Sequence, residues 1–251
     1  MLESQSISCV IVDTYPNRVF AKLACDQMRK AMPKAQMYVI SDENFFEGAT
    51  FYRINPITSM RSYDSIVLSM IPAIVKEDYT LIFQWDGFII NKDRFLIDYL
   101  NYDYIGAPWY HIATPPLVGN GGFSLRSKRL NDFLLRTTLC PDTNILDGFN
   151  EDVRLCISHR QRAEDAGLTF APVALAETFS FEHRFFPSTF GFHGMFNFPL
   201  LFDEQFLLDF FDNILARTKG ESFWRAFHAR ASFSGMKKLC LRIQQSLNLK
   251  Q

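Results

Sequence analysis

Short apolar runs alternate with longer segments of helical periodicity in the first part of the chain, and this alternation constrains the fold most strongly. Ile7–Val12 and Tyr79–Phe83 are rich in β-branched and aromatic residues and predict buried strands. Arg18–Met32 and Ser62–Lys76 carry apolar residues at helical spacing and predict helices. Strands that alternate with helices pair in a mainly parallel sheet. The predicted fold class is therefore α/β, a mixed, mainly parallel sheet flanked by helices.

The same periodicities predict the remaining elements. Further strands are expected over Met37–Ile40, Thr50–Ile54, Asp103–Trp109, Phe123–Arg126 and within Ala171–Phe181. Further helices are expected over Lys128–Thr137, Asp152–Arg162, Leu200–Arg217 and Phe223–Leu249, with a turn over Gly191–Gly194. Pro72 predicts an interruption of the helix that contains it. A boundary after residue 218 divides the chain into a main domain, 1–218, and a basic helical tail, 219–251.

The composition excludes several classes of protein. The chain has 251 residues, of which 48% are hydrophobic and 21% charged, so it can bury a large core and is not disordered, collagen-like or a coiled coil. A net charge of −1 gives no general attraction to nucleic acid. The five cysteines form no CxxC pair, which argues against a zinc site or a disulfide framework. Without a signal peptide or an apolar run of about 18 residues, the sequence predicts a cytoplasmic protein.

The tail differs from the rest of the chain in charge. Residues 216–251 contain eight Lys and Arg against one acidic residue, whereas the remainder contains 18 basic and 26 acidic residues. An apolar stripe recurs at helical spacing beside basic residues, and consists of Met236, Leu239, Ile243 and Leu247. One interpretation is an amphipathic helix on the anionic inner face of a membrane. The alternative is a terminal helix packed on the core with a solvated basic side.

Polar residues follow two of the predicted strands. Asp13 and Thr14 come directly after Ile7–Val12, and Gln84-Trp85-Asp86-Gly87 comes after Tyr79–Phe83. Ligands of parallel α/β sheets bind beyond the carboxyl ends of the strands, where these side chains are expected. Divalent cations prefer carboxylate and phosphate oxygens, so Asp86 is a candidate metal ligand. The alternative is a turn aspartate that accepts hydrogen bonds from its own backbone.

Three further motifs carry candidate site residues. The loop Gly119-Asn120-Gly121-Gly122 lets backbone approach a ligand closely, or forms an ordinary hairpin, and Arg126 after it binds phosphate or pairs on the surface. In Asn150-Glu151-Asp152, a carboxylate either acts as general base or complements a helix dipole. His193 lies in a glycine-flanked turn and is either structural or shares a cation with an aspartate. Glu182 and His183, close by in the sequence, either support it or belong to the polar surface.

In this order, the motifs resemble those of GT-A-type nucleotide-sugar glycosyltransferases. The closer similarity is to a largely uncharacterised family of glycosyltransferase-like proteins, and it spans Ile7 to His193. The segments that carry it are Gln84-Trp85-Asp86, Tyr102–Trp109, Gly119–Arg126, Asn150–Asp152 and Gly191–His193. The resemblance implies a GT-A-like domain with a C-terminal helical extension.

The resemblance also implies roles for residues at the metal and donor sites. Asp86 corresponds to the last carboxylate of an Asp-x-Asp metal motif, and His193 to a metal ligand near the end of the domain. Gln84 stands where the first aspartate usually lies and, with Trp85, belongs to the donor site. An amide adds no charge, so weaker metal affinity is expected.

Other positions would contact the donor or the acceptor. Asp13 and Thr14 would contact the nucleotide, and Gly119, Asn120, Gly121 and Gly122 would lie beside the donor sugar and acceptor. Arg126 is a further donor-binding candidate. Asp152 matches the catalytic base of inverting members, with Glu151 beside it.

The implied activity is transfer of a sugar from a nucleotide-sugar donor, with UDP as the expected nucleotide, to a hydroxyl of a glycan or glycolipid. Mn²⁺ or Mg²⁺ is the expected cofactor, inversion the expected outcome, and polysaccharide or lipopolysaccharide biosynthesis the expected context. One alternative is a catalytically inactive nucleotide-sugar binding protein, which Gln84 favours. Another is a nucleotidyltransferase, although no lysine-rich phosphate loop follows the first strand. A hydrolase with two carboxylates explains neither the glycine loop nor His193.

Overall fold

The computed structural model describes residues 6–112, 115–137, 150–218 and 220–247. It divides into two compact units, Met1–His193 and Gly194–Gln251. The domain boundary expected after residue 218 falls inside the second unit and stays a prediction. Residues 219 and 248–251 of the expected tail lie outside the described residues.

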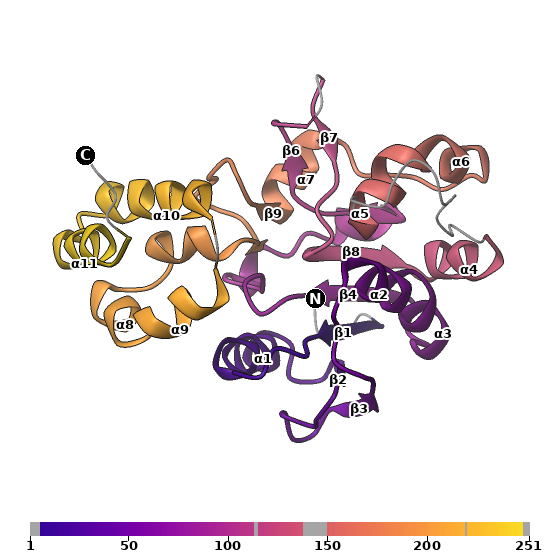
Figure 1. Ribbon diagram of the computed structural model, residues 1–251. Coiled ribbons are helices and arrows are strands. Elements are labelled where there is room, and N and C mark those ends of the chain that lie inside the picture. Colours follow the sequence, from indigo (N-terminus) through magenta and orange to yellow (C-terminus); the bar gives the residue numbers. More distant parts are fainter. Residues whose placement is uncertain (1–5, 113–114, 138–149, 219, 248–251) are drawn as a thin grey trace. The chain divides into compact units, whose positions relative to one another are not determined.

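The first unit is built on a six-stranded sheet (Figure 1). Its strand order is β3 (Thr50–Arg53), β2 (Gln36–Ser41), β1 (Ile7–Val12), β4 (Tyr79–Phe83), β8 (Phe123–Ser127) and β5 (Tyr104–Ile105). The first four strands are parallel, and β8 is antiparallel to both of its neighbours. The predicted α/β fold class, with a mixed and mainly parallel sheet flanked by helices, is therefore confirmed.

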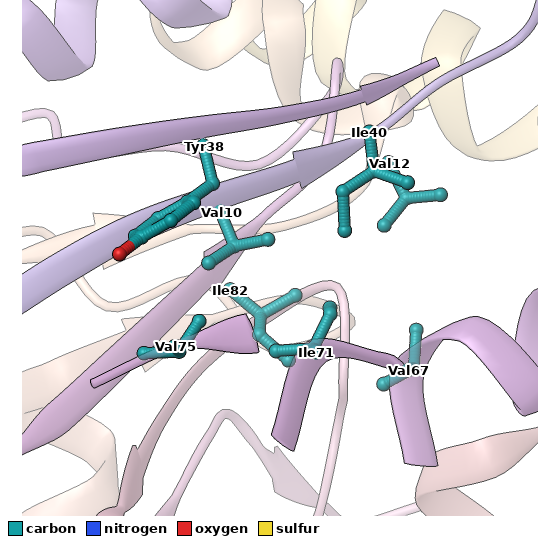
Figure 2. Packing of buried hydrophobic residues seen from close by; sticks show 8 residues of the cluster. All are labelled: Val10, Val12, Tyr38, Ile40, Val67, Ile71, Val75 and Ile82. Atoms are coloured by element: carbon teal, nitrogen blue, oxygen red, sulfur yellow. The ribbon is translucent and has the colours of Figure 1, made fainter. Parts of the chain in front are cut away.

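Helices cover both faces of this sheet. Successive residues of β1 point to opposite faces, so the contacts of this strand identify the helices on each side. On one side, the Sγ of Cys9 lies 3.7 Å from the Sδ of Met32, directly after α1 (Val19–Ala31). On the other, Val10 and Val12 pack with Ile71 and Val75 (Figure 2). This second layer contains α2 (Met60–Ser65), a π-helical segment η2 (Ile66–Met70) and α3 (Ile71–Ile74). The interruption expected at Pro72 is thus present, with the proline in the first turn of α3.

The segment after β4 is less regular. It contains the short 3₁₀ helices η3 (Lys92–Arg94) and η4 (Ile97–Asn101), the hairpin β6 (Pro108–Trp109) and β7 (Leu117–Val118), and α4 (Lys128–Arg136). The strand expected over Asp103–Trp109 is wrong as a single element, because the chain leaves the sheet between β5 and β6. Gly106 lies between these two strands, and a Cβ at this position would overlap the carbonyl oxygens of Gly119 and Asn120.

Of two expectations for residues 150–193, the helix is present but interrupted, and the strands are mostly wrong. The helix over Asp152–Arg162 is divided into α5 (Glu151–Val153), a π-helical segment η5 (Arg154–Ser158) and α6 (Arg160–Asp165). The strands expected within Ala171–Phe181 are mostly one helix, α7 (Val173–Phe179), followed by β9 (Ser180–Phe181). Pro172 is the N-cap of α7, and alanine, leucine and glutamate favour its helical conformation. The expected turn at Gly191 begins with a two-residue strand, β10 (Gly191–Phe192), parallel to β9.

The second unit is helical. It contains η6 (Met195–Leu200), α8 (Glu204–Asp209), α9 (Phe211–Arg217), α10 (Glu221–Phe233) and α11 (Lys237–Leu247). The predicted helix over Phe223–Leu249 is divided at Gly235, whose φ of +71° ends α10. Within the described part of the chain, no helix has both the length and the apolar character needed to span a bilayer.

Candidate functional site

The sheet topology brings two sequence motifs to one edge. Strands β1 and β4 are parallel neighbours and end at the same edge, whereas the antiparallel β8 begins there. The pair Phe83 and Phe123 marks this edge in the register of β4 and β8. The Gln84–Gly87 turn therefore leaves the sheet at the point where the Gly119–Gly122 loop enters it. The antiparallel direction of β8, which the sequence does not reveal, causes this convergence.

His193 joins the same edge from much later in the chain. Its backbone N–H donates to the Phe181 carbonyl at 2.9 Å, and Gly191 forms a β-bridge with Ile89. The Nε2 atom of His193 lies 3.6 Å from Oδ1 of Asp86. The two residues predicted as metal ligands are therefore neighbours in space.

Glu182 and Asn120 orient the imidazole of His193. The Nδ1 of His193 lies 2.9 Å from Oε1 of Glu182, and the Asn120 amide, 2.9 Å from Nδ1, also donates to Glu182. A proton on Nδ1 that is held by this carboxylate leaves Nε2 to face Asp86. Burial lowers the pKa of His193, but the carboxylates of Asp86 and Glu182 outweigh this effect and raise it to about 9. Without a metal ion, His193 thus supplies a positive charge that balances the negative charge of Asp86. A cation bound at Nε2 would displace the proton from that nitrogen.

Gln84 adds an oxygen to this cluster. Its Nε2 donates to the hydroxyl oxygen of Tyr63 at 2.5 Å, and its Oε1 lies 3.1 Å from Nε2 of His193. Because Tyr63 takes the amide N–H₂, the carbonyl oxygen is directed to the side shared with Asp86. Tyr63, on α2, was missed by sequence reasoning, because no motif marks a lone tyrosine.

This donor set fits a divalent cation with open coordination positions. Among the described residues, no cluster of three or more His, Cys, Asp or Glu side chains could hold a metal. The carboxylate of Asp86, Nε2 of His193 and the amide oxygen of Gln84 supply two oxygens and one nitrogen. Mn²⁺ and Mg²⁺ accept such ligands and complete their shell with water or phosphate oxygens. The Glu182 carboxylate behind His193 is the support that metal-binding histidines commonly have.

Asp152 presents a carboxylate held by two backbone donors. Its Oδ2 accepts from the N–H of Gly121 at 2.8 Å, and its Oδ1 accepts from the N–H of Val153 at 2.8 Å. The glycine loop therefore fixes the orientation of Asp152. A carboxylate that is held in one orientation is suited to accept a proton from a bound hydroxyl.

Glu151 has a different environment from Asp152. It is 2% exposed, and its Oε1 accepts from Nη2 of the 1% exposed Arg126 at 2.8 Å. Burial and the Asp152 carboxylate raise the pKa of Glu151 to about 8, although Arg126 opposes the change. Arg126, predicted to bind the donor, is not among the cavity-lining residues of the described chain. We propose that Arg126 and Glu151 position the loop and helix around Asp152.

A second buried ion pair anchors the same segment. Nε of Arg154 donates to Oδ2 of Asp64 at 2.9 Å, and the backbone N–H of Glu151 also donates to Asp64. Burial raises the pKa of Asp64, and Arg154 opposes this shift. The start of α5 is thereby tied to α2. A π-helical segment follows each of these two helices, and such segments are frequent at functional sites.

A cavity of about 560 Å³ opens beside these groups. Of the predicted site residues, Gln84, Gly122, Glu151, Asp152 and His193 line it. The opposite wall was missed by sequence reasoning and consists of Ile57, Thr58, Ser59, Met60 and Tyr63. This volume is in the range of small-molecule sites.

Asp13, Thr14 and Trp85 are not among the residues that line this cavity. Thr14 Oγ1 accepts from the N–H of Ile57 at 2.8 Å and so holds the opposite wall. Asp13 Oδ1 accepts from the N–H of Tyr15 at 2.7 Å and pairs with Arg18 at 3.5 Å. The ring of Trp85 lies 6.1 Å from that of Phe20 between centroids. Donor contacts of Asp13, Thr14 and Trp85 stay predictions.

The glycines of the 119–122 loop are needed for close packing. A Cβ at Gly119, Gly121 or Gly122 would overlap Trp109, Glu151 or His193, respectively. Positive φ does not explain them, because in this loop only Asn120 has it, at 60°. The loop therefore brings protein side chains together, a role that the sequence left open between ligand approach and a hairpin.

Gly122→Ala is expected to displace the His193 ring, because the added methyl group would occupy the space of Nε2. The dissociation constant for Mn²⁺, measured by isothermal titration calorimetry, should rise by about tenfold or more, as for loss of a supporting contact to a metal ligand. Gly48→Ala is the control, because nothing lies within 4 Å of the position that an added Cβ would take. The φ of Gly48 is +73°, so the variant should lose about 1 kcal/mol of stability. Its affinity for Mn²⁺ should be unchanged. Unchanged Mn²⁺ affinity in Gly122→Ala would contradict the proposed role of His193 as a metal ligand.

The fold is similar to that of a solved glycosyltransferase. A glycosyltransferase involved in the glycosylation of the major capsid of PBCV-1 matches with a TM-score of 0.51 and 12% identity, over 74% of this chain and 91% of that chain. At this identity the likeness shows the fold alone.

The family, in contrast, is shown by sequence. The chain belongs to the family described as "Protein of unknown function (DUF5672)", whose model matches residues 49–193, more than half of the chain. This region contains every predicted site residue except Asp13 and Thr14. A search of curated proteins gives no match.

Two other solved structures are also similar. The apo-form glycosyltransferase GlyE of Streptococcus pneumoniae TIGR4 has a TM-score of 0.49 and 14% identity, over 75% of this chain and 54% of that chain. The bifunctional IspDF of Campylobacter jejuni has a TM-score of 0.41 and 12% identity, over 66% of this chain. The match spans 49% of IspDF, about half of its length.

Proposed function

We propose that this protein is a divalent-cation-dependent glycosyltransferase that uses a nucleoside-diphosphate sugar. The observation that carries the proposal is that Nε2 of His193 lies 3.6 Å from Oδ1 of Asp86. His193 lines the same cavity as Gln84 and Asp152. The glycosyltransferase fold supports it independently. Metal dependence, the donor and the acceptor are the parts that need experiment.

In this proposal, the donor diphosphate lies at the side of the cavity that Gln84 and His193 line, next to Asp86. A cation held by Asp86, His193 and Gln84 would neutralise the negative charge on the departing diphosphate. Tyr63 keeps the amide oxygen of Gln84 on that side, and Glu182 keeps Nε2 of His193 there. Asp86 is the one acidic ligand in this set, which is consistent with the weaker metal affinity expected from Gln84.

Asp152 is the proposed general base. As the acceptor oxygen bonds to the anomeric carbon, the bond from that carbon to the diphosphate oxygen breaks, and its electron pair leaves with the diphosphate. The hydroxyl proton passes to the carboxylate of Asp152. Glu151 also lines the cavity, but its carboxylate is held by Arg126, so we assign no nucleophilic role to it. A single displacement of this kind inverts the anomeric configuration.

The test is a screen of nucleotide sugars with and without Mn²⁺, in which release of nucleoside diphosphate is measured. We expect release from one donor class, UDP sugars being tested first, and its loss on treatment with EDTA. An Asp86→Asn variant should require about tenfold or more Mn²⁺ for half-maximal release, because the acidic ligand is removed.

The outcomes separate the candidate functions. Tight binding of a nucleotide sugar without release would instead favour a catalytically inactive binding protein, the alternative that the uncharged Gln84 supports. Release at the same rate in EDTA would contradict metal dependence. Release of pyrophosphate from a nucleoside triphosphate would contradict the proposal altogether.

A further inference from the structure

Two large apolar side chains are exposed in the second unit, one at the end of α10 and one in the second turn of α11. Phe233 is 80% exposed and Leu241 is 57% exposed. Lys237 and Lys238, both exposed, lie between them in the sequence. These four residues are called the tip patch below. Exposed apolar residues that are mixed with lysines are typical of surfaces that bind anionic bilayers.

The turn between the two helices fixes the direction of Phe233. The N–H of Met236 donates to the Ala231 carbonyl at 2.9 Å, and the N–H of Gly235 donates to the Ser232 carbonyl at 3.0 Å. With a φ of +71° at Gly235, this is a Schellman motif. Phe233 follows the buried Ala231 by two residues, about 200° around the helix, so it faces away from the buried side of α10. Its exposure is therefore a consequence of a defined turn.

The same division into two faces holds for α11. Lys237 and Lys238 precede Leu241 by four and three residues, so the three side chains share one face. Leu239 and Ile243 are fully buried on the other face, where α11 packs against α8 and α10. The apolar stripe that was one candidate for membrane contact is thus largely buried against the neighbouring helices. The face available to lipid is the opposite one.

Charge also distinguishes the tip patch. Among the described residues, Arg225 pairs with Glu221 and Arg242 lies 3.5 Å from Asp212. No ion pair of Lys237 or Lys238 is found in the same part of the chain. The nearby Glu204 accepts the N–H of Leu239 at 3.1 Å, and so acts at the first turn of α11. The positive charges of these two lysines thus lie on the same helix as the exposed Leu241.

We propose that the tip patch docks this protein on an anionic lipid bilayer, with Phe233 and Leu241 entering the headgroup region and both lysines contacting lipid phosphates. The inference does not depend on the proposed sugar transfer. It would place the protein at the surface where a lipid-linked acceptor is found.

The test is co-sedimentation of the full chain with vesicles of phosphatidylcholine containing phosphatidylglycerol, compared with phosphatidylcholine alone. Wild type should bind the anionic vesicles, and Lys237→Glu/Lys238→Glu should weaken binding by about 30-fold or more, as expected for loss of two surface cations. Phe233→Ser/Leu241→Ser should weaken it by about tenfold or more. Thermal denaturation of each variant establishes that it is folded.

Matched controls isolate the patch. Lys22→Glu/Lys30→Glu changes the net charge equally at exposed lysines of the first unit, and Leu135→Ser removes a 51% exposed leucine of α4. Both should bind as wild type does. Equal loss in the controls, equal binding to neutral vesicles, or no vesicle binding would overturn the proposal. Self-association in sedimentation velocity that Phe233→Ser/Leu241→Ser abolishes, without vesicle binding, would assign the patch to a second copy of the chain.

Discussion

Asp152→Asn is expected to lower the turnover number for sugar transfer by about 10²–10⁴-fold, the usual contribution of a positioned general base. Asparagine keeps the size of the side chain but cannot take the proton of the acceptor hydroxyl. The proposed cation site lies around Asp86 and His193, so the dissociation constant for Mn²⁺ with nucleoside diphosphate should stay within about twofold of wild type. Turnover is measured as nucleoside diphosphate release with acceptor present, and binding by calorimetry.

The control for this variant is Asp132→Asn, a substitution at an exposed carboxylate on α4 that pairs with Lys128. It should leave both turnover and binding unchanged. If Asp152→Asn transferred sugar at the wild-type rate, Asp152 would not be the base. If it lost nucleotide binding as well, its role would be structural, through the Gly121 N–H.

Glu151→Ala is expected to cost about 3–5 kcal/mol of unfolding free energy, since it strands a buried cation. Arg126 is 1% exposed and cannot discharge by losing a proton. Arg126→Met should cost less, because the remaining Glu151, whose pKa is already raised to about 8, can become neutral. Glu151→Gln should cost least, because its amide oxygen can still accept from Arg126. The measurement is urea denaturation at pH 7.

The order of these three costs is the informative result. We expect Arg126→Met to lower the unfolding free energy less than Glu151→Ala does. An equal or greater decrease would contradict the argument that arginine, unlike glutamate, cannot become neutral when its partner is removed. Lys128→Ala, which breaks an exposed pair with Asp132, is the control and should change stability by less than about 1 kcal/mol.

The strands and helices before residue 90 could be predicted because each has a clear period. Ile7–Val12 and Tyr79–Phe83 have the observed bounds of β1 and β4. The helix α7 was mistaken for strands because Phe179 and Phe181 suggest alternation, whereas the helix-forming residues before them decide the conformation. The Asp152–Arg162 helix is divided by η5 in a segment where Arg154 pairs with Asp64 and Glu151 pairs with Arg126. Local sequence does not contain these tertiary pairs.

The candidate site was partly accessible from sequence for a similar reason. The motifs identified Asp86, His193 and Asp152 as candidate site residues. The position of Asp86 directly after a predicted strand also placed it at the carboxyl edge of the sheet. Tyr63 and the Ile57–Met60 wall could not be found, because their role arises only when α2 packs beside the β4 turn. The function of the glycines was also hidden, since the side chains that fill their missing Cβ positions come from remote segments.

The most direct test of the cation site is a crystal grown with Mn²⁺ and UDP, with diffraction data collected near the manganese absorption edge. One anomalous peak is expected between Oδ1 of Asp86 and Nε2 of His193, with a diphosphate oxygen on its open side. A peak elsewhere, or bound UDP with no peak between these two atoms, would contradict it.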